Sequence, residues 1–253
     1  MTRHHRPSVH ANGRCFDRLH APPRVIAAMV TPCDRPGVID PDAAAGLART
    51  LLDAGCDGLF VGSSTGEMPL LGVDQRVALL SAVRRAVGDD APLYAGVSGL
   101  GVSDTLAITR KLADAGADVA VAMSPFFLKL SGAELLAYFR ALADASPLPL
   151  AVYHHLRMPS PIGLDTLRGL ADHPNFVAIK DTSRDLERCR GMCDLAGSDG
   201  GSDGGGFEVY QGSEAIVHDS LAAGATGCVT ALAGAVPEWH RELIDAWRRG
   251  DDA

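Results

Sequence analysis

The feature of this sequence that most limits its fold is an eightfold alternation of short apolar segments with longer segments of helical periodicity. The short segments are rich in β-branched residues and have the length of strands. The predicted strands are Val25–Thr31, Asp57–Val61, Pro92–Ala95, Asp118–Met123, Leu148–Tyr153, Phe176–Lys180, Phe207–Gln211 and Thr226–Thr230. The predicted helices begin near Pro41, Val73, Ser103, Ser131, Leu164, Arg184, Ser213 and Pro237.

Local signals at the ends of the helices agree with this alternation. Asp40 and Pro41 supply an N-cap and a proline at the first helical position. An Ala-Gly pair ends a helix just before a strand in three places, at Gly55, Gly116 and Gly224. This recurring Ala-Gly motif is a weak internal repeat, as expected for a chain built from similar strand–helix units.

Apolar strands joined by helices indicate a parallel sheet that is covered on both faces. Eight units fit a closed (β/α)8 barrel, and single barrels of this kind often run to about 250 residues. An open doubly wound sheet would favour a phosphate-binding turn after its first strand, and Thr31–Pro36 does not have that pattern. The predicted fold is therefore an α/β protein of the (β/α)8, or TIM-barrel, class.

The barrel is expected to occupy residues 25–253 as one domain. Residues 1–24 hold five arginines and four histidines against one aspartate and lack an apolar stretch, so a disordered basic extension is predicted. Residues 197–206 consist only of glycine, serine and aspartate, which predicts a flexible insertion on the surface.

Composition excludes several classes of partner. With 23 basic and 31 acidic residues, the chain has no overall positive field for nucleic acid or an anionic membrane. No run approaches the ~20 apolar residues of a membrane span. Six cysteines without a Cys-x-x-Cys pair indicate reduced thiols and a cytoplasmic protein. Small molecules are the expected partners.

Three polar features follow three different predicted strands: the turn Gly62–Glu67, Tyr153 and Lys180. The carboxyl ends of barrel strands share one mouth, where active sites lie. A lysine buried there favours its neutral amine, which attacks a ketone to form a Schiff base. A tyrosine can carry out the accompanying proton transfers. A glycine-flanked Ser-Thr turn offers hydroxyl and backbone N–H groups that can bind a carboxylate. The predicted substrate is a small 2-oxo acid.

These residues resemble the motifs of the dihydrodipicolinate synthase/N-acetylneuraminate lyase family. Lys180 is followed by Asp-Thr-Ser, and the turn after the second strand reads Gly-Ser-Ser-Thr-Gly-Glu. Further matching segments are Met29–Pro32, Ser124–Phe127, Gly212–Glu214 and Gly224–Val229. The resemblance runs from Val25 to the C-terminus. The family usually continues into a small helical region beyond the eighth helix, most of which this chain is expected to lack.

The resemblance implies a class I aldolase or lyase. Lys180 would form an imine with pyruvate or a related 2-oxo acid, and a C–C bond to an aldehyde would be made or broken. Tyr153 and Thr65 are the further catalytic residues that it implies. The substrate-binding residues that it implies are Ser64, Thr65, Gly212 and Val229. It implies no metal or other cofactor beyond the covalent imine, and a homo-oligomer, either a dimer or a tetramer.

The chain departs from the synthase pattern at two positions. Phe127 stands where the synthases usually carry a second tyrosine that relays protons. Met158 stands where they carry an arginine for the carboxylate of the aldehyde, and Arg157 would replace it only if the loop shifted by one residue. We therefore expect a different aldehyde acceptor from that of the lysine pathway, with His154 and His155 as candidates for shaping its site.

Three alternatives remain open. Ser64 lies in a Gly-x-Ser-x-Gly pattern and could be a hydrolase nucleophile with Asp181 and His218, although Pro69 would fall inside the helix which that elbow requires. A metal-dependent aldolase is disfavoured, because the adjacent histidines point to opposite sides of an extended chain. A non-catalytic barrel that only binds a 2-oxo acid is the third alternative.

Overall fold

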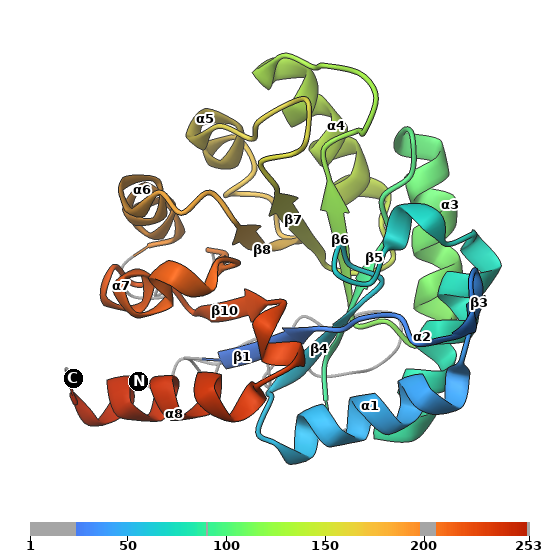
Figure 1. Ribbon diagram of the computed structural model, residues 1–253. Coiled ribbons are helices and arrows are strands. Elements are labelled where there is room, and N and C mark those ends of the chain that lie inside the picture. Colours follow the sequence, from blue (N-terminus) through green and yellow to red (C-terminus); the bar gives the residue numbers. More distant parts are fainter. Residues whose placement is uncertain (1–23, 90, 198–205, 252–253) are drawn as a thin grey trace, which may run out of the picture.

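The computed structural model describes residues 24–89, 91–197 and 206–251. Its centre is a closed barrel of eight parallel strands, in the spatial order β1-β10-β9-β8-β7-β6-β5-β4 (Figure 1). The barrel strands are β1 (Arg24–Ala28), β4 (Gly58–Val61), β5 (Leu93–Gly96), β6 (Val119–Met123), β7 (Leu150–His154), β8 (Phe176–Asp181), β9 (Glu208–Gln211) and β10 (Gly227–Thr230). The predicted (β/α)8 fold is confirmed.

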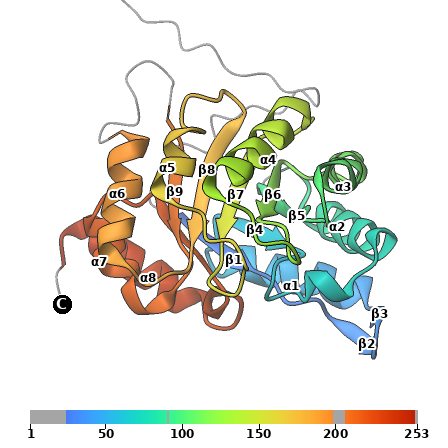
Figure 2. The same cartoon turned by 90° about the horizontal axis from the view of Figure 1, so that it is seen from above.

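Eight α-helices of the described residues surround this ring of strands (Figures 1 and 2). They are α1 (Pro41–Asp53), α2 (Val73–Val87), α3 (Val102–Asp114), α4 (Gly132–Ala145), α5 (Leu164–Arg168), α6 (Leu186–Ala196), α7 (Val217–Ala222) and α8 (Pro237–Arg249). Short 3₁₀ helices follow three strands: η2 (Met68–Leu70), η3 (Glu214–Ile216) and η4 (Leu232–Gly234).

The predicted signals at the helix ends are present in the structure. The carboxylate of Asp40 caps α1 by accepting the backbone N–H groups of Asp42 and Ala43. The three glycines of the Ala-Gly motif, Gly55, Gly116 and Gly224, have φ angles of +96°, +101° and +102°. This left-handed backbone reverses the chain after a helix, and glycine adopts it without steric cost.

Two apolar cores hold the barrel together. The larger lies between the outer face of the strands and the helices, as the continuous apolar character of the strands requires. The smaller fills the interior of the barrel and includes Ile26, Phe60, Val121, Tyr153 and Tyr210. The interior is therefore a packed core, and polar groups that lie above it face the mouth of the barrel.

The first predicted strand is shorter than expected, because the barrel strand ends at Ala28. The chain then forms a two-stranded hairpin, β2 (Cys33–Arg35) and β3 (Val38–Ile39), outside the ring of strands (Figure 2). Gly37 at its tip has a φ of +76°. Its carbonyl accepts a hydrogen bond of 2.7 Å from Gln75 Nε2, which fastens the hairpin to α2. Strands this short carry too little periodicity to be predicted.

The predicted extension at residues 1–24 and the predicted insertion at residues 197–206 lie almost entirely outside the described residues, so both stay predictions. Within the described ranges, none of the helices is both long enough and apolar enough to cross a membrane. Cys33, Cys56, Cys189, Cys193 and Cys228 are free thiols.

Candidate active site

Lys180 lies on β8 with only 6% of its surface exposed. Its Nζ is 4.4 Å from the ring centroid of Tyr153 and 5.3 Å from that of Phe60. Burial lowers the pKa of its ammonium group to about 7, an effect that Glu214 and Cys228 partly oppose. A far larger share of Lys180 than of an exposed lysine is therefore a neutral amine at neutral pH, the form in which an amine acts as a nucleophile.

Tyr153 lies beside Lys180 because β7 and β8 pair in parallel with these two residues opposite each other. Its hydroxyl is 3.0 Å from Ser64 Oγ. Burial raises the pKa of Tyr153 to about 12, while the hydrogen bond with Ser64 and the charge of Arg157 oppose this increase. The phenol is therefore protonated at neutral pH and can both donate and accept a proton through its hydrogen bond.

Ser64 and Thr65 lie in the turn between β4 and η2. Two hydrogen bonds fix the shape of this turn: Gly66 N–H donates to Ser63 Oγ at 3.3 Å, and Thr31 Oγ1 donates to the Gly66 carbonyl at 2.7 Å. The side chain of Ser64 is exposed and that of Thr65 is half-buried. Ser64 is therefore accessible to solvent, and Thr65 is partly accessible.

Gly212 and Val229 lie on the other side of Lys180. The N–H of Gly212 donates to the Asp181 carbonyl at 2.7 Å. A Cβ atom at Gly212 would be 2.5 Å from Thr182 Cγ2 and 3.0 Å from Lys180 Cε, so only glycine leaves room for the lysine side chain. Val229 is buried in the barrel interior, where it lines a small cavity together with Lys180. The structure thus brings both residues to the lysine.

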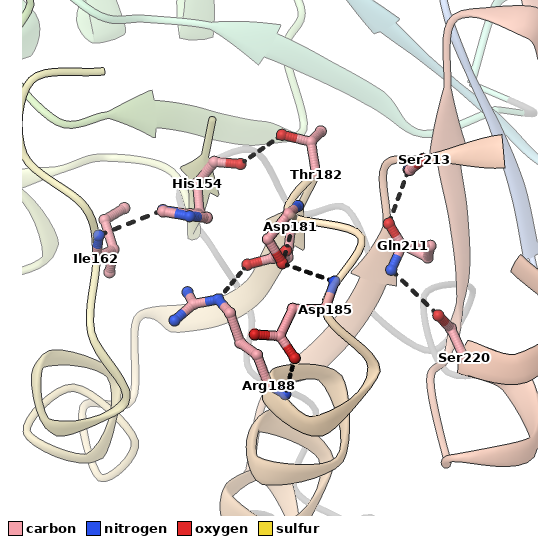
Figure 3. A network of polar contacts seen from close by, with 10 residues as sticks. His154, Ile162, Asp181, Thr182, Asp185, Arg188, Gln211, Ser213 and Ser220 are labelled. Atoms are coloured by element: carbon pink, nitrogen blue, oxygen red, sulfur yellow. Dashed lines mark hydrogen bonds and ion pairs between the residues drawn. The ribbon is translucent and has the colours of Figure 1, made fainter. Parts of the chain in front are cut away.

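Asp181 points toward Arg188 on α6, and His154 points toward Ile162 in the loop before α5 (Figure 3). The Asp181 carboxylate is 2.6 Å from Arg188 Nε and also accepts the N–H of Ser183. His154 Nδ1 accepts the N–H of Ile162 at 3.3 Å. The expectation that His154 shapes the acceptor site is therefore wrong, because the alternation of β7 turns its side chain outward.

His155, the other expected acceptor residue, lies at the site. Its ring packs edge-on against Tyr153, with 5.6 Å between the centroids. Met158 packs against the barrel-interior core, whereas Arg157 is exposed. Phe127, in the loop after β6, is 87% exposed.

The geometry contradicts the hydrolase alternative. The hydroxyl of Ser64 is hydrogen-bonded to that of Tyr153, the carboxylate of Asp181 is paired with Arg188 on α6, and His218 lies on α7. These three side chains form no catalytic triad. Among the residues that the structure describes, no group of three or more His, Cys, Asp or Glu side chains is placed to hold a metal ion.

Three residues of the site were not singled out from the sequence: Phe60, Thr31 and Glu214. Phe60 supplies an aromatic face to the lysine, Thr31 braces the turn, and Glu214 raises the lysine pKa. Thr31 and Glu214 lie inside segments that match the family, so the motifs contained the signal without assigning a role. Phe60 carries no such signal, because its role depends on which side chains of β4 point into the barrel.

Comparison with known proteins identifies the family. The sequence pattern of the dihydrodipicolinate synthetase family matches residues 21–253. The chain belongs to this family. Family members are lyases, so the prediction of a lyase is confirmed. The 4-hydroxy-tetrahydrodipicolinate synthase of Mycobacterium leprae is 36% identical over 229 residues, which are 90% of this chain and 73% of that protein.

Solved structures of this family agree. Dihydrodipicolinate synthase DapA-2 from Bacillus anthracis has a TM-score of 0.83 at 29% identity, over 90% of this chain and 76% of that one. YagE from Escherichia coli K12, a family member solved in complex with pyruvate, has the same score, identity and coverage. The expectation of a different aldehyde acceptor gains no support, because relatives at 36–37% identity bear the synthase name.

Proposed function

We propose that this family member is a class I aldolase in which Lys180 forms an imine with pyruvate or a related 2-oxo acid. The observation that carries the proposal is the buried amine of Lys180, with a pKa lowered to about 7, at 4.4 Å from the ring centroid of Tyr153. A desolvated lysine beside a protonated phenol is suited to Schiff-base chemistry. A related protein that binds pyruvate, YagE, supports the choice of 2-oxo acid.

In the first half of the reaction, the neutral amine of Lys180 adds to the ketone carbon of pyruvate. Loss of water from the resulting carbinolamine gives the imine, and protonation of the imine nitrogen followed by loss of a C3 proton gives the enamine. Tyr153 transfers protons in these steps, and its hydrogen bond of 3.0 Å connects it to Ser64 and through Ser64 to the mouth.

In the second half, the electron pair of the enamine forms a bond to the carbonyl carbon of an aldehyde. The aldehyde oxygen takes up a proton, and hydrolysis of the imine restores the amine of Lys180. The reverse sequence cleaves the same bond. Each step uses only side chains of the site, the two substrates and water, so the proposed reaction requires no cofactor.

The carboxylate of the 2-oxo acid is assigned to the turn at Ser64 and Thr65, which carries two hydroxyls and backbone N–H groups of the kind that bind carboxylates. Gly212 and Val229 border the imine. The names of the relatives make the aldehyde that leads to 4-hydroxy-tetrahydrodipicolinate the first acceptor to test. A homo-oligomer and a cytoplasmic location remain predictions.

Trapping with borohydride tests the proposal directly. The folded protein is incubated with pyruvate and reduced, and its intact mass and peptide map are measured. We expect a single adduct on Lys180, no adduct in Lys180→Ala, and a normal adduct in the control Lys111→Ala, which changes an exposed lysine paired with Asp74. Absence of an adduct on folded wild-type protein would instead favour the non-catalytic barrel.

A further inference from the structure

We propose that His155 is a further catalytic residue, whose Nε2–H donates a hydrogen bond to the carbonyl oxygen of the aldehyde acceptor. This inference rests on the proposed aldolase function and assigns a role to a side chain which that function leaves unused. It concerns the carbonyl group that every aldehyde has, so it holds for any acceptor.

The position of His155 follows from the end of β7. Tyr153 faces the barrel interior and His154 faces outward, and His155 is the first residue after the strand. Its ring contacts Tyr153 at an interplanar angle of 82°. It also interacts electrostatically with Lys180. The imidazole therefore adjoins Tyr153 and lies close enough to Lys180 for the charge of the lysine to influence it.

A hydrogen bond fixes the tautomer of the ring. His155 Nδ1 accepts the backbone N–H of Arg157 at 3.1 Å, so Nδ1 carries no proton. Burial, together with the charges of Arg157 and Lys180, lowers the pKa of His155, which favours the neutral form of the ring. A neutral imidazole with an occupied Nδ1 has one proton to offer, on Nε2.

Such a donor stabilises the charge that develops in the proposed bond-forming step. As the enamine carbon bonds to the aldehyde carbon, the π electrons of the carbonyl move to its oxygen. His155 keeps its proton and only donates a hydrogen bond, while Tyr153 supplies the proton that the oxygen takes up. A fixed donor at a developing oxyanion contributes about 10² to 10³ in rate.

Two matched substitutions separate this role from a structural one. In His155→Gln the amide nitrogen reaches the position of Nε2, so the donor is kept. In His155→Asn the side-chain oxygen replaces Nδ1 as the acceptor for Arg157, but the donor at the Nε2 position is lost. His218→Gln, at an exposed position on α7, is the control.

The experiment measures two activities of each variant: pyruvate trapping by borohydride, and condensation of pyruvate with an aldehyde. The aldehydes are glyoxylate, succinic semialdehyde, glyceraldehyde, benzaldehyde and the aldehyde that leads to 4-hydroxy-tetrahydrodipicolinate. We expect wild-type trapping in all variants, condensation lowered about 10² to 10³-fold in His155→Asn, and a loss of no more than about tenfold in His155→Gln.

Three results would overturn the assignment. One is full condensation activity in His155→Asn, and another is a parallel loss of trapping and condensation, as expected of a purely structural residue. The third is a wild-type protein that traps pyruvate but condenses it with none of these aldehydes. Failure of the wild type to trap pyruvate at all is a different result, because it contradicts the proposed function itself.

Discussion

Lys180 and Tyr153 are directly opposite residues of two paired parallel strands, and the lysine Nζ lies 4.4 Å from the tyrosine ring centroid. The first prediction concerns this lysine. Because only its neutral form attacks a ketone, the rate of imine formation at low pyruvate concentration should rise with pH up to about 7 and then level off. Trapping rates with cyanoborohydride between pH 5.5 and 8.5 measure this. A rate that still climbs tenfold per pH unit at pH 8.5 would show that the amine is not desolvated.

The same lysine should make the native protein less stable, most strongly below pH 7. In the native state it releases its proton near pH 7, but in the unfolded chain it does so only near 10.5, so the unfolded state binds more protons between these values. The contribution of Lys180 to the free energy of unfolding of the wild type therefore becomes more favourable as the pH rises from 7 to 10.5. The Lys180→Met variant has no ammonium group to bury, so it avoids both the destabilisation by the buried charge and this dependence of stability on pH.

Urea denaturation of the wild type and Lys180→Met at pH 6 and pH 9 measures the effect. We expect the variant to be more stable at pH 6, and its advantage to shrink by about 2 to 3 kcal/mol at pH 9. The comparison between the two proteins cancels the titration of all other groups. An advantage that is equal at both pH values would contradict the lowered pKa of Lys180.

The hydroxyl of Tyr153 is the subject of the third prediction. Tyr153→Phe should still form the imine but exchange the C3 protons of pyruvate with deuterium about 10² to 10⁴-fold more slowly, because the group that moves the proton is gone. NMR of pyruvate in D₂O measures this exchange. Tyr138→Phe is the matched control, since it removes a buried hydroxyl that is 3.2 Å from Thr105 Oγ1 and lies on α4. Equal exchange rates in both variants would leave Tyr153 without a catalytic role.

The sequence predicted the parts of this molecule that depend on local rules. The positive φ angles at Gly55, Gly116 and Gly224 follow from the need to reverse the chain after a helix. The placement of Lys180 at the end of a strand follows from the apolar run Phe176–Ile179 that precedes it. In both cases the signal lies within a few residues of the position that it determines.

Other features depend on contacts between distant parts of the chain. Ser64 and Tyr153 are 89 residues apart, and only closure of the barrel brings their hydroxyls to 3.0 Å. The pairing of Asp181 with Arg188 depends on how α6 packs against β8. The sequence motif assigned Ser64 to the substrate carboxylate but did not indicate its hydrogen bond with Tyr153. A motif describes neighbouring residues and gives no distance to a residue far away in the sequence.

The ion pair behind the lysine gives the fourth prediction. Asp181 is 1% exposed, and Asp181→Asn leaves the half-buried guanidinium of Arg188 without its charged partner. Breaking a buried pair in this way typically costs about 3 to 5 kcal/mol of unfolding free energy. Asp165→Asn, which breaks an exposed pair with Arg168, should cost less than about 1 kcal/mol. Urea denaturation compares the two, and similar small losses would mean that solvent screens the inner pair as well.

The last prediction concerns the contact between Gly212 and Lys180. In Gly212→Ala the new methyl group would approach Thr182 Cγ2 to 2.5 Å and Lys180 Cε to 3.0 Å. The neighbouring Asp181 carbonyl, also at 3.0 Å, belongs to the backbone of β8, so relief must come from side chains and the lysine is pushed from its place beside Tyr153. We expect pyruvate trapping to slow at least about tenfold, with a loss of stability of about 1 to 3 kcal/mol.

Two further variants make this test specific. Gly163→Ala adds a methyl group where nothing lies within 4 Å and should trap pyruvate normally. Adding Thr182→Ser to Gly212→Ala removes the atom of closest approach while it keeps the hydroxyl that donates to the His154 carbonyl at 3.1 Å. This double variant should recover part of the trapping rate. If Gly212→Ala alone traps pyruvate at the wild-type rate, Lys180 does not depend on the space beside Gly212.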